Sequence, residues 1–224
     1  MGLKESGLRG SLRNVSVGID AIPDSENLHA HYDAQLLLLD DQDTMSEWPD
    51  QSGNDNDIPS VGSPTYETDA INGNPAVLFD GEDDKFEGDW DDLDSAPYSI
   101  YVVVVLNNTS ITGRIVNEDS NNQFLRWDDG NWETREVSGS SDENIKQLSF
   151  LLENSNFAAL YEEGAETGTT TSPRMETWSD LTIGARETEN YWEGHIGEII
   201  FYDVFHDSET RQEVESYLFS RWGI

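Results

Sequence analysis

The sequence contains no cysteine among its 224 residues, and lysine occurs only at positions 4, 85 and 146. The absence of cysteine excludes disulfide bonds, zinc–thiolate sites and cysteine nucleophiles. No apolar run reaches the length of about 18 residues that a membrane-spanning helix needs, so no membrane insertion is expected. Residues 1–16 contain neither the apolar segment of a secretory signal peptide nor a twin-arginine pair, so we do not expect ordinary secretion.

Basic residues are scarce as a class, with 12 Lys and Arg against 46 Asp and Glu and a net charge of −34. Binding to nucleic acid through phosphate contacts needs clustered Lys and Arg, so no nucleic-acid partner is expected. At about 1 M salt the Debye length is only about 3 Å, which screens the repulsion among carboxylates. The composition is similar to that of haloarchaeal proteins and predicts a protein that is adapted to molar salt concentrations. An ordinary acidic mesophile protein is the alternative.

Apolar residues are sufficient for a core, since hydrophobic residues make up 35% and aromatic residues 10% of the chain. From residue 28 onward, short apolar runs separated by Gly, Asn, Asp, Ser and Pro predict an all-β domain. The strongest run, Tyr98–Leu106, predicts a central strand covered on both faces. Residues 124–127 and 132–137 predict one hairpin, and residues 145–153 and 156–162 predict another strand pair. Together these patterns indicate a two-sheet sandwich.

One helix is predicted, at the C-terminus. Asp207 or Ser208 can cap its first turn, and Val214 and Leu218 can face the sheet. Gly223 is the residue type expected to end it.

Residues 1–27 differ from the domain predicted over residues 28–224. Positions 1–13 have a net charge of +2, whereas positions 14–224 have a net charge of −36. The segment has no strong hydrophobic period, so it is predicted to be an extended N-terminal arm, either a frayed tail or a docking arm. In the docking interpretation the positive tip suits an acidic partner, through Lys4, Leu8, Arg9, Leu12 and Arg13.

Several stretches of residues 28–224 resemble one family, in the same order along the chain. They are WPDQSGNDND at 48–57, INGNPAVLFDGEDD at 71–84, APYSIYVV at 96–103, IGAR at 183–186, YWEGHIGEIIFYD at 191–203 and the end of the chain at 214–224. These stretches are similar to the laminin-G-like members of the concanavalin A-like lectin/glucanase superfamily. The resemblance implies an all-β, two-sheet antiparallel jelly roll with a short C-terminal helix, in agreement with the pattern of apolar runs.

A second resemblance concerns the N-terminal residues. SGLRGSLRNVS at 6–16, followed by AIPDS at 21–25, resembles the leader of structural proteins from haloarchaeal tailed viruses. This implies a virion protein that is released by lysis and lies on the virion surface, in an extracellular medium of high salt. The arm would then bind other virion proteins. A homo-oligomer is expected, because such arms usually act in symmetric assemblies.

The superfamily that the chain resembles includes glucanases, which need two carboxylates that flank the glycosidic bond to be cleaved. One branch of these hydrolases places them on a single strand as Glu-x-Asp-x-x-Glu, and the same letters occur here at residues 82–87. Charged Asp83 and Lys85 stand where a core-facing strand would have apolar residues, and the site falls in a predicted turn. No Gly-x-Ser-x-Gly elbow is present. A non-enzymatic protein is therefore expected.

Relatives often hold calcium with loop carboxylates and carbonyls, and Ca²⁺ takes 6 to 8 oxygen ligands. Two acidic loops are the candidates for a calcium site. Their residues are Asp50, Asn54 and Asp57 in the first loop and Asp80, Asp83 and Asp84 in the second. The alternative for the second loop is turn formation on an acidic surface.

Sugar binding would use aromatic faces that stack on pyranose rings. Trp127 and Trp132 frame one predicted hairpin, and Tyr191 and Trp192 follow Asn190. The competing interpretation is packing in the core or between strands. The leading hypothesis is a virion surface protein, such as a capsid turret, decoration protein or tail-associated adhesin, that can bind host-surface glycans. The alternative is a cellular carbohydrate-binding module or glycoside hydrolase of a halophile.

Overall fold

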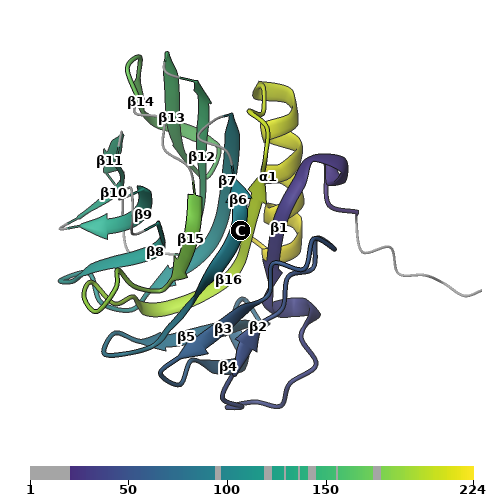
Figure 1. Cartoon of the computed structure of the whole chain (residues 1–224), viewed down its shortest axis with the longest axis vertical. Coiled ribbons are helices and arrows are strands. Elements are labelled where there is room, and N and C mark those ends of the chain that lie inside the picture. Colours follow the sequence, from purple (N-terminus) through teal and green to yellow (C-terminus); the bar gives the residue numbers. More distant parts are fainter. Residues whose placement is uncertain are drawn as a thin grey trace, which may run out of the picture.

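Two antiparallel β-sheets pack face to face, and the C-terminal helix lies on the outer face of one of them (Figure 1). The computed structural model describes residues 21–93, 97–118, 123–128, 130–135, 137–140, 145–154, 156–173 and 178–224. The predicted all-β sandwich with a short C-terminal helix is confirmed. Within the described part of the chain, no helix is long and apolar enough to cross a membrane.

The first sheet has the strand order β14-β13-β12-β7-β16-β5-β4, and β1 also pairs with β16. Its strands are β1 (Leu28–Asp33), β4 (Thr65–Ile71), β5 (Asn74–Asp80), β7 (Tyr98–Leu106), β12 (Lys146–Asn154), β13 (Phe157–Glu162), β14 (Ala165–Thr170) and β16 (Glu193–Tyr202). Strand β16 pairs with β5 over residues 193–196 and with β1 over residues 198–202. Strand β16 therefore pairs with β7 along one side and with β5 and then β1 along the other.

The second sheet has the order β11-β10-β9-β8-β15-β6-β3-β2. Its strands are β2 (Glu47–Trp48), β3 (Ile58–Val61), β6 (Lys85–Leu93), β8 (Thr112–Glu118), β9 (Gln123–Asp128), β10 (Asn131–Thr134), β11 (Ser138–Ser140) and β15 (Trp178–Ile183). The remaining elements are two 3₁₀ turns, η1 (Ser25–Asn27) and η2 (Ala34–Leu36), and the helix α1 (Ser208–Trp222). Both predicted hairpins are present, as β9–β10 and β12–β13.

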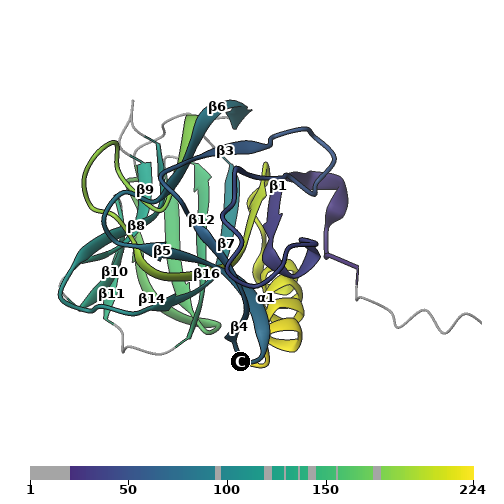
Figure 2. The same ribbon diagram turned by 90° about the horizontal axis from the view of Figure 1, so that it is seen from below.

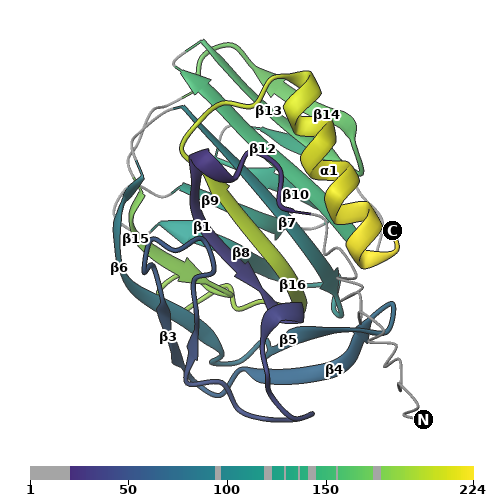
Figure 3. The same ribbon diagram turned by 90° about the vertical axis from the view of Figure 1, so that its right-hand side faces the viewer.

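Strand β7 lies between β12 and β16 and is apolar on both faces, as its sequence predicts. Ile100 and Val102 point into the core between the sheets, whereas Tyr101 and Val103 belong to the cluster on the outer face. Helix α1 covers that outer face (Figures 2 and 3). Its side chains Val214, Leu218 and Trp222 are fully buried in the cluster there. The centre of the first sheet is therefore buried on both sides, whereas the edge strands β4 and β14 keep exposed residues.

Helix α1 begins and ends as its sequence predicts. The Asp207 carboxylate accepts hydrogen bonds from the backbone N–H groups of Glu209 and Thr210, at 3.1 and 2.9 Å. Gly223 has φ +67°, and its N–H donates to the Phe219 carbonyl. These contacts satisfy backbone groups that a helix leaves unpaired at its ends.

The contacts between the N-terminal segment and the sandwich begin before residue 28. Ile22 packs against the cluster beneath α1, and the Tyr202 hydroxyl donates to the Pro23 carbonyl at 2.8 Å. The Asp24 carboxylate lies 3.1 Å from His206 Nε2. The predicted arm residues Lys4, Leu8, Arg9, Leu12 and Arg13 lie outside the described residues.

Candidate functional site

The tryptophans predicted to stack on sugars belong to the core. Trp127, Trp132 and Trp192 are 2%, 1% and 0% exposed. The ring centroids of Trp127 and Trp132 are 5.0 Å apart, and those of Trp132 and Trp192 are 6.0 Å apart. The prediction of a stacking platform at these residues is wrong, because a sugar ring needs an uncovered aromatic face. Of the four predicted aromatic residues, only Tyr191 is partly exposed.

The loop that contains Asp50 is held by its own hydrogen bonds. The two Asp50 oxygens accept from the backbone N–H groups of His31, Ser52 and Asn56 and from the Ser52 hydroxyl, at 2.6 to 3.1 Å. A carboxylate offers about four lone-pair positions, and these donors occupy them. The other two predicted ligands are also engaged, since Asn54 donates to the carbonyls of residues 28 and 29 and Asp57 accepts from the Asp50 N–H. We therefore assign Asp50, Asn54 and Asp57 to loop closure rather than to a metal.

The second predicted set does come together. One carboxylate oxygen from each of Asp80, Asp83 and Asp84 lies within 4.8 Å of the others. Asp84 is 5% exposed, and it accepts hydrogen bonds from the N–H groups of Ser63, at 2.6 Å, and Asp80, at 3.2 Å. Asp80 and Asp83 are exposed, and Asp80 Oδ1 accepts hydrogen bonds from the backbone N–H groups of Glu82, at 2.8 Å, and Asp83, at 3.3 Å, whereas no donor from the described residues reaches Asp80 Oδ2. We call residues 80–84 the acidic turn.

Burial raises the pKa of the Asp84 carboxyl, and the charges of Asp80 and Asp83 add to that increase. Gly62 allows the neighbouring loop to approach, because a Cβ there would lie 2.5 Å from the Asp83 carbonyl oxygen. Three carboxylates at one turn repel one another, and a cation would relieve the repulsion. The acidic turn is therefore the one predicted metal set that the described residues bring together.

The pairing of β5 with β16 places a second group of residues beside the acidic turn. Asp80 is the register partner of Glu193, the first residue of β16. The Asn108 side-chain amide donates to Glu193 Oε2 at 2.7 Å. Tyr191 precedes Glu193 by two positions. We call this edge of the sandwich the acidic rim, with the residues Asp80, Asp83, Asp84, Asn108, Tyr191 and Glu193. It combines carboxylates, a carboxamide and a partly exposed aromatic ring, which are the groups that bind sugar hydroxyls and ring faces.

The letters that match a hydrolase motif do not lie on a single strand. Glu82 is in the acidic turn, and β6 begins only at Lys85. Lys85 is buried and forms an ion pair with Glu87, and its Nζ donates to the Glu187 carbonyl at 2.6 Å. Phe86 points into the core. Glu82 and Glu87 therefore lack the single-strand arrangement of that hydrolase branch.

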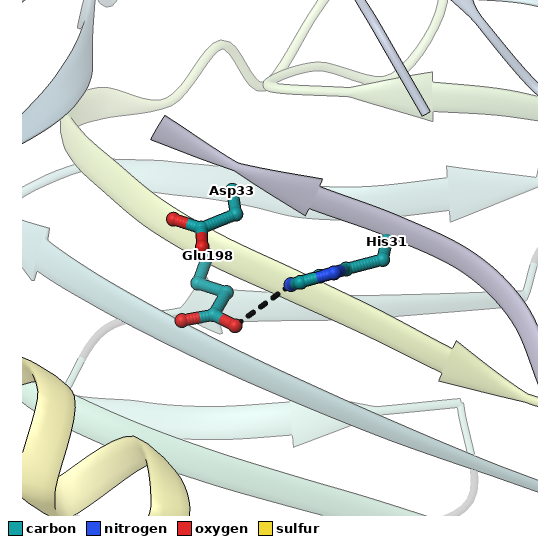
Figure 4. A group of neighbouring side chains, drawn as sticks. All are labelled: His31, Asp33 and Glu198. Carbon is teal, nitrogen blue, oxygen red and sulfur yellow. Dashed lines mark hydrogen bonds and ion pairs between the residues drawn. The ribbon is translucent and has the colours of Figure 1, made fainter. Parts of the chain in front are cut away.

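A second titratable cluster, which the sequence did not predict, lies beneath α1. It contains His31, Asp33 and Glu198, all buried (Figure 4). His31 Nε2 lies 2.8 Å from Glu198 Oε1, and the indole N–H of Trp222 donates to Glu198 Oε2 at 2.7 Å. Arg221 forms ion pairs with both Asp33 and Glu198. The cluster thus joins β1 and β16 to the last turn of the helix.

This cluster has a structural role, because protein donors already occupy the carboxylates. Burial raises the pKa of Asp33 to about 6, and the negative charge of Glu198 also raises it, whereas the positive charge of Arg221 lowers it. The sequence contains one indication of this cluster, because Glu198 interrupts the apolar residues in the second half of β16. This pattern indicates a buried charge but does not identify its partners, which come from β1 and α1.

Sequence comparison finds no matching family model and no matching characterised protein. Solved structures do match the fold. The receptor-binding domain of botulinum neurotoxin C/D mosaic serotype is 13% identical with a TM-score of 0.67, and the match covers 89% of this chain and 55% of that one. The binding domain of Paraclostridial Mosquitocidal Protein 1 is 12% identical with a TM-score of 0.65, covering 88% and 53%. The present chain thus spans about half the length of these toxin domains.

A third match extends over almost the whole of the other chain. Domain 4 of AbnA, a GH43 extracellular arabinanase from Geobacillus stearothermophilus solved in complex with arabinotriose, is 16% identical with a TM-score of 0.55. The match covers 85% of this chain and 98% of that domain. At these identities the similarity establishes a shared β-sandwich fold.

Proposed function

We propose that this chain is a non-enzymatic glycan-binding protein and that the acidic rim is its sugar-binding site. The observation that carries the proposal is that the register of β5 with β16 places the acidic turn beside Glu193 and its partner Asn108, with the partly exposed Tyr191 two residues before Glu193. An aromatic face stacks on a pyranose ring, while carboxylates and amides bind its hydroxyls. A domain of the same fold solved in complex with arabinotriose supports the proposal. Two toxin domains named as binding domains share this fold, which is consistent with a binding role.

Calcium is proposed as the cofactor of this rim. Asp80 and Asp83 present exposed carboxylates, and Asp84 lies beneath them. Calcium takes 6 to 8 oxygens at about 2.3 to 2.6 Å, so three carboxylates leave positions for carbonyls, water or sugar hydroxyls. The ion would offset the repulsion within the acidic turn and would attract hydroxyl oxygens that the carboxylates alone bind weakly.

Calcium and sugar are therefore expected to bind together. We expect Asp83→Asn to weaken both by about tenfold or more, and Tyr191→Ala to weaken glycan binding alone by about tenfold, in line with one lost stacking contact. Calcium binding is measured by titration calorimetry, and glycan binding on a glycan array and then by calorimetry with the strongest ligand. The matched control is Asp69→Asn, an exposed acid on β4. Full glycan binding by Asp83→Asn or in excess EDTA would contradict the calcium proposal, and full binding by Tyr191→Ala would contradict the site.

The biological setting is proposed to be the surface of a haloarchaeal virus particle, as a capsid turret, decoration protein or tail-associated adhesin in a high-salt medium. The leader-like sequence at residues 6–16, the net charge of −34 and the positive N-terminal tip support this proposal. Residues 1–20 would bind other virion proteins, and the sandwich would contact host-surface glycans. A cellular carbohydrate-binding module or glycoside hydrolase of a halophile is the alternative.

Deletion of residues 1–20 tests the arm. The truncated chain should stay folded, because it keeps Ile22 and Pro23, which contact the sandwich, but it should no longer be incorporated into particles. Incorporation is measured by mass spectrometry of purified virions, and folding by circular dichroism. Incorporation of the truncated chain at the wild-type level would contradict the docking arm.

An assay for cleavage of β-glucans tests the hydrolase alternative. Cleavage by the wild type that is lost in Glu82→Gln or Glu87→Gln would favour that alternative over the non-enzymatic proposal.

A further inference from the structure

A buried histidine lies where the N-terminal segment meets the start of α1. The His206 side chain is 1% exposed, and its ring centroid lies 4.4 Å from that of Tyr202 and 5.6 Å from that of Tyr101. The His206 N–H donates to Ser99 Oγ at 2.9 Å. Both the backbone and the ring of this histidine are therefore held in place by β7 and β16.

Both ring nitrogens of His206 have a protein partner. Nδ1 lies 2.8 Å from the Tyr101 hydroxyl oxygen, and Nε2 lies 3.1 Å from Asp24 Oδ2. An ionised carboxylate can only accept, so Nε2 carries the proton and Nδ1 of a neutral ring accepts from the Tyr101 hydroxyl. In a protonated ring both nitrogens donate, and the Tyr101 hydroxyl would lose this acceptor. The geometry therefore suits the neutral form of the ring.

The ionisable groups that face the ring come from four elements. They are Asp24 at the start of η1, Tyr101 on β7, Tyr202 on β16 and Asp207 at the start of α1. Burial raises the pKa of both tyrosine hydroxyls, so these hydroxyls stay neutral. Burial also lowers the pKa of His206 below the ordinary 6.5, whereas the charges of Asp24 and Asp207 raise it by less. The surroundings thus favour the neutral ring as well.

Residues 22–26, which we call the N-terminal clasp, connect the N-terminal segment to this site. Ile22 packs against the cluster beneath α1, and the Tyr202 hydroxyl donates to the Pro23 carbonyl at 2.8 Å. The Asn27 side-chain amide, next to β1, donates at 2.9 Å to the same carboxylate that contacts the histidine ring. All residues of the clasp are partly or fully exposed. A segment held in this way can open without unfolding of the sheets.

We propose that protonation of His206 at mildly acidic pH releases the N-terminal clasp while the two sheets stay folded. A charged ring needs water around it, and opening of the clasp gives the ring access to solvent. In the open form the pKa of the ring returns to the ordinary 6.5, above that of the closed form. The closed form is therefore most stable above this pH and loses stability as the pH falls below it, until the pH reaches the pKa of the closed form. Within that window the ratio of open to closed clasp rises by up to about tenfold for each pH unit.

Hydrogen exchange measured by NMR on the full chain in about 2 M salt tests the proposal. The reporter is the Asn27 N–H, which donates to the Asp24 carbonyl at 3.1 Å and is freed when the clasp opens. After correction for the intrinsic effect of pH on exchange, its rate should be about fivefold or more higher at about pH 5 than at about pH 7.5. The Val102 N–H in β7 reports opening of the sheets and should show no such increase. An equal corrected rate for Asn27 at the two pH values would overturn the proposal.

Titration of the ring itself is a second measurement that needs no variant. The NMR signals of the His206 ring should titrate with a midpoint below 6.5, because the buried ring resists protonation. A midpoint at or above this value would mean that the closed clasp does not disfavour the charged ring, and the proposal would then be wrong.

A variant without a titratable ring should lose the response. His206→Gln keeps a donor and an acceptor but does not titrate, so the corrected exchange of Asn27 should be the same at both pH values. The matched control is His195→Gln, since His195 is partly exposed on β16 and pairs with Glu67 at 2.7 Å. It should respond like the wild type. A His206→Gln variant that is folded by circular dichroism and still responds would contradict the role of His206.

Asp24→Asn identifies the group that takes up the proton. If acid acted on the Asp24 carboxyl, this variant would no longer respond to pH. With His206 as the titrating group the response persists, because loss of the nearby negative charge makes the closed ring still harder to protonate. Loss of the response in Asp24→Asn would therefore assign the effect to Asp24 and refute the proposal.

Discussion

Replacement of Glu198 by alanine is expected to lower the free energy of unfolding by about 3 to 5 kcal/mol, the usual cost of removing one partner from a buried ion pair. Glu198 is fully buried and accepts hydrogen bonds from the Trp222 indole at 2.7 Å and the Tyr217 hydroxyl at 3.3 Å. Its loss would leave these donors and His31 unpaired beneath α1. Urea denaturation at about 2 M salt, followed by circular dichroism, measures the effect.

The matched control is Glu189→Ala, which removes an exposed ion pair between Glu189 and Arg186. Exposed pairs contribute about 0 to 1 kcal/mol, so this variant should be close to wild type. Glu198→Gln keeps the shape of the side chain and one hydrogen-bond acceptor. It should therefore lower the free energy of unfolding by less than Glu198→Ala does. If Glu198→Ala and Glu189→Ala had equal, small effects, the buried cluster would not be what holds the helix on the sheet.

Transfer from about 2 M to about 0.05 M salt is expected to unfold the domain, with a loss comparable to the whole net stability of about 5 to 15 kcal/mol. The structure strengthens this expectation, because many basic groups point inward. Lys85, Lys146, Arg114 and Arg211 are 2% to 6% exposed, which leaves the carboxylates on the surface with few cations near them. At low salt the repulsion among these carboxylates extends over longer distances and opposes the compact state.

The salt effect is measured by thermal denaturation at a series of sodium chloride concentrations. Sucrose in place of salt is the control, since a neutral solute leaves the electrostatic repulsion unscreened. Salt should restore the folded state at low protein concentration, and sucrose should restore much less. Equal stability at about 0.05 M and about 2 M salt would contradict the screening argument and favour an ordinary acidic protein.

Local sequence patterns were sufficient to predict the central strand and the C-terminal helix of the fold. The run Tyr98–Leu106 has the same bounds as β7, because a strand buried on both faces needs apolar residues at every position. The helix begins after Asp207 and ends at Gly223, since the cap interactions depend on residues that are neighbours in sequence. The acidic turn was predicted for the same reason, as its three carboxylates lie within five consecutive positions.

Long-range pairing decided the rest of the candidate site. Asp80 and Glu193 are far apart in sequence, and only the register of β5 with β16 places them side by side. The hairpin pattern placed Trp127 and Trp132 on the two strands of one hairpin, and the structure pairs them directly across β9 and β10. It did not show that the second sheet turns this face toward the core, so the prediction of an exposed platform was wrong.

By itself, the sequence determined the two-sheet class, the positions of the central strand and the C-terminal helix, and the strongly negative charge, since periodicity, caps and composition are local or additive properties. The tertiary structure alone decided which aromatic rings are covered, which carboxylates meet at the acidic rim, and that Glu198 joins β1 and β16 to α1. These properties depend on which face of each element meets another, and that is set by strand register and sheet packing rather than by any single stretch of the chain.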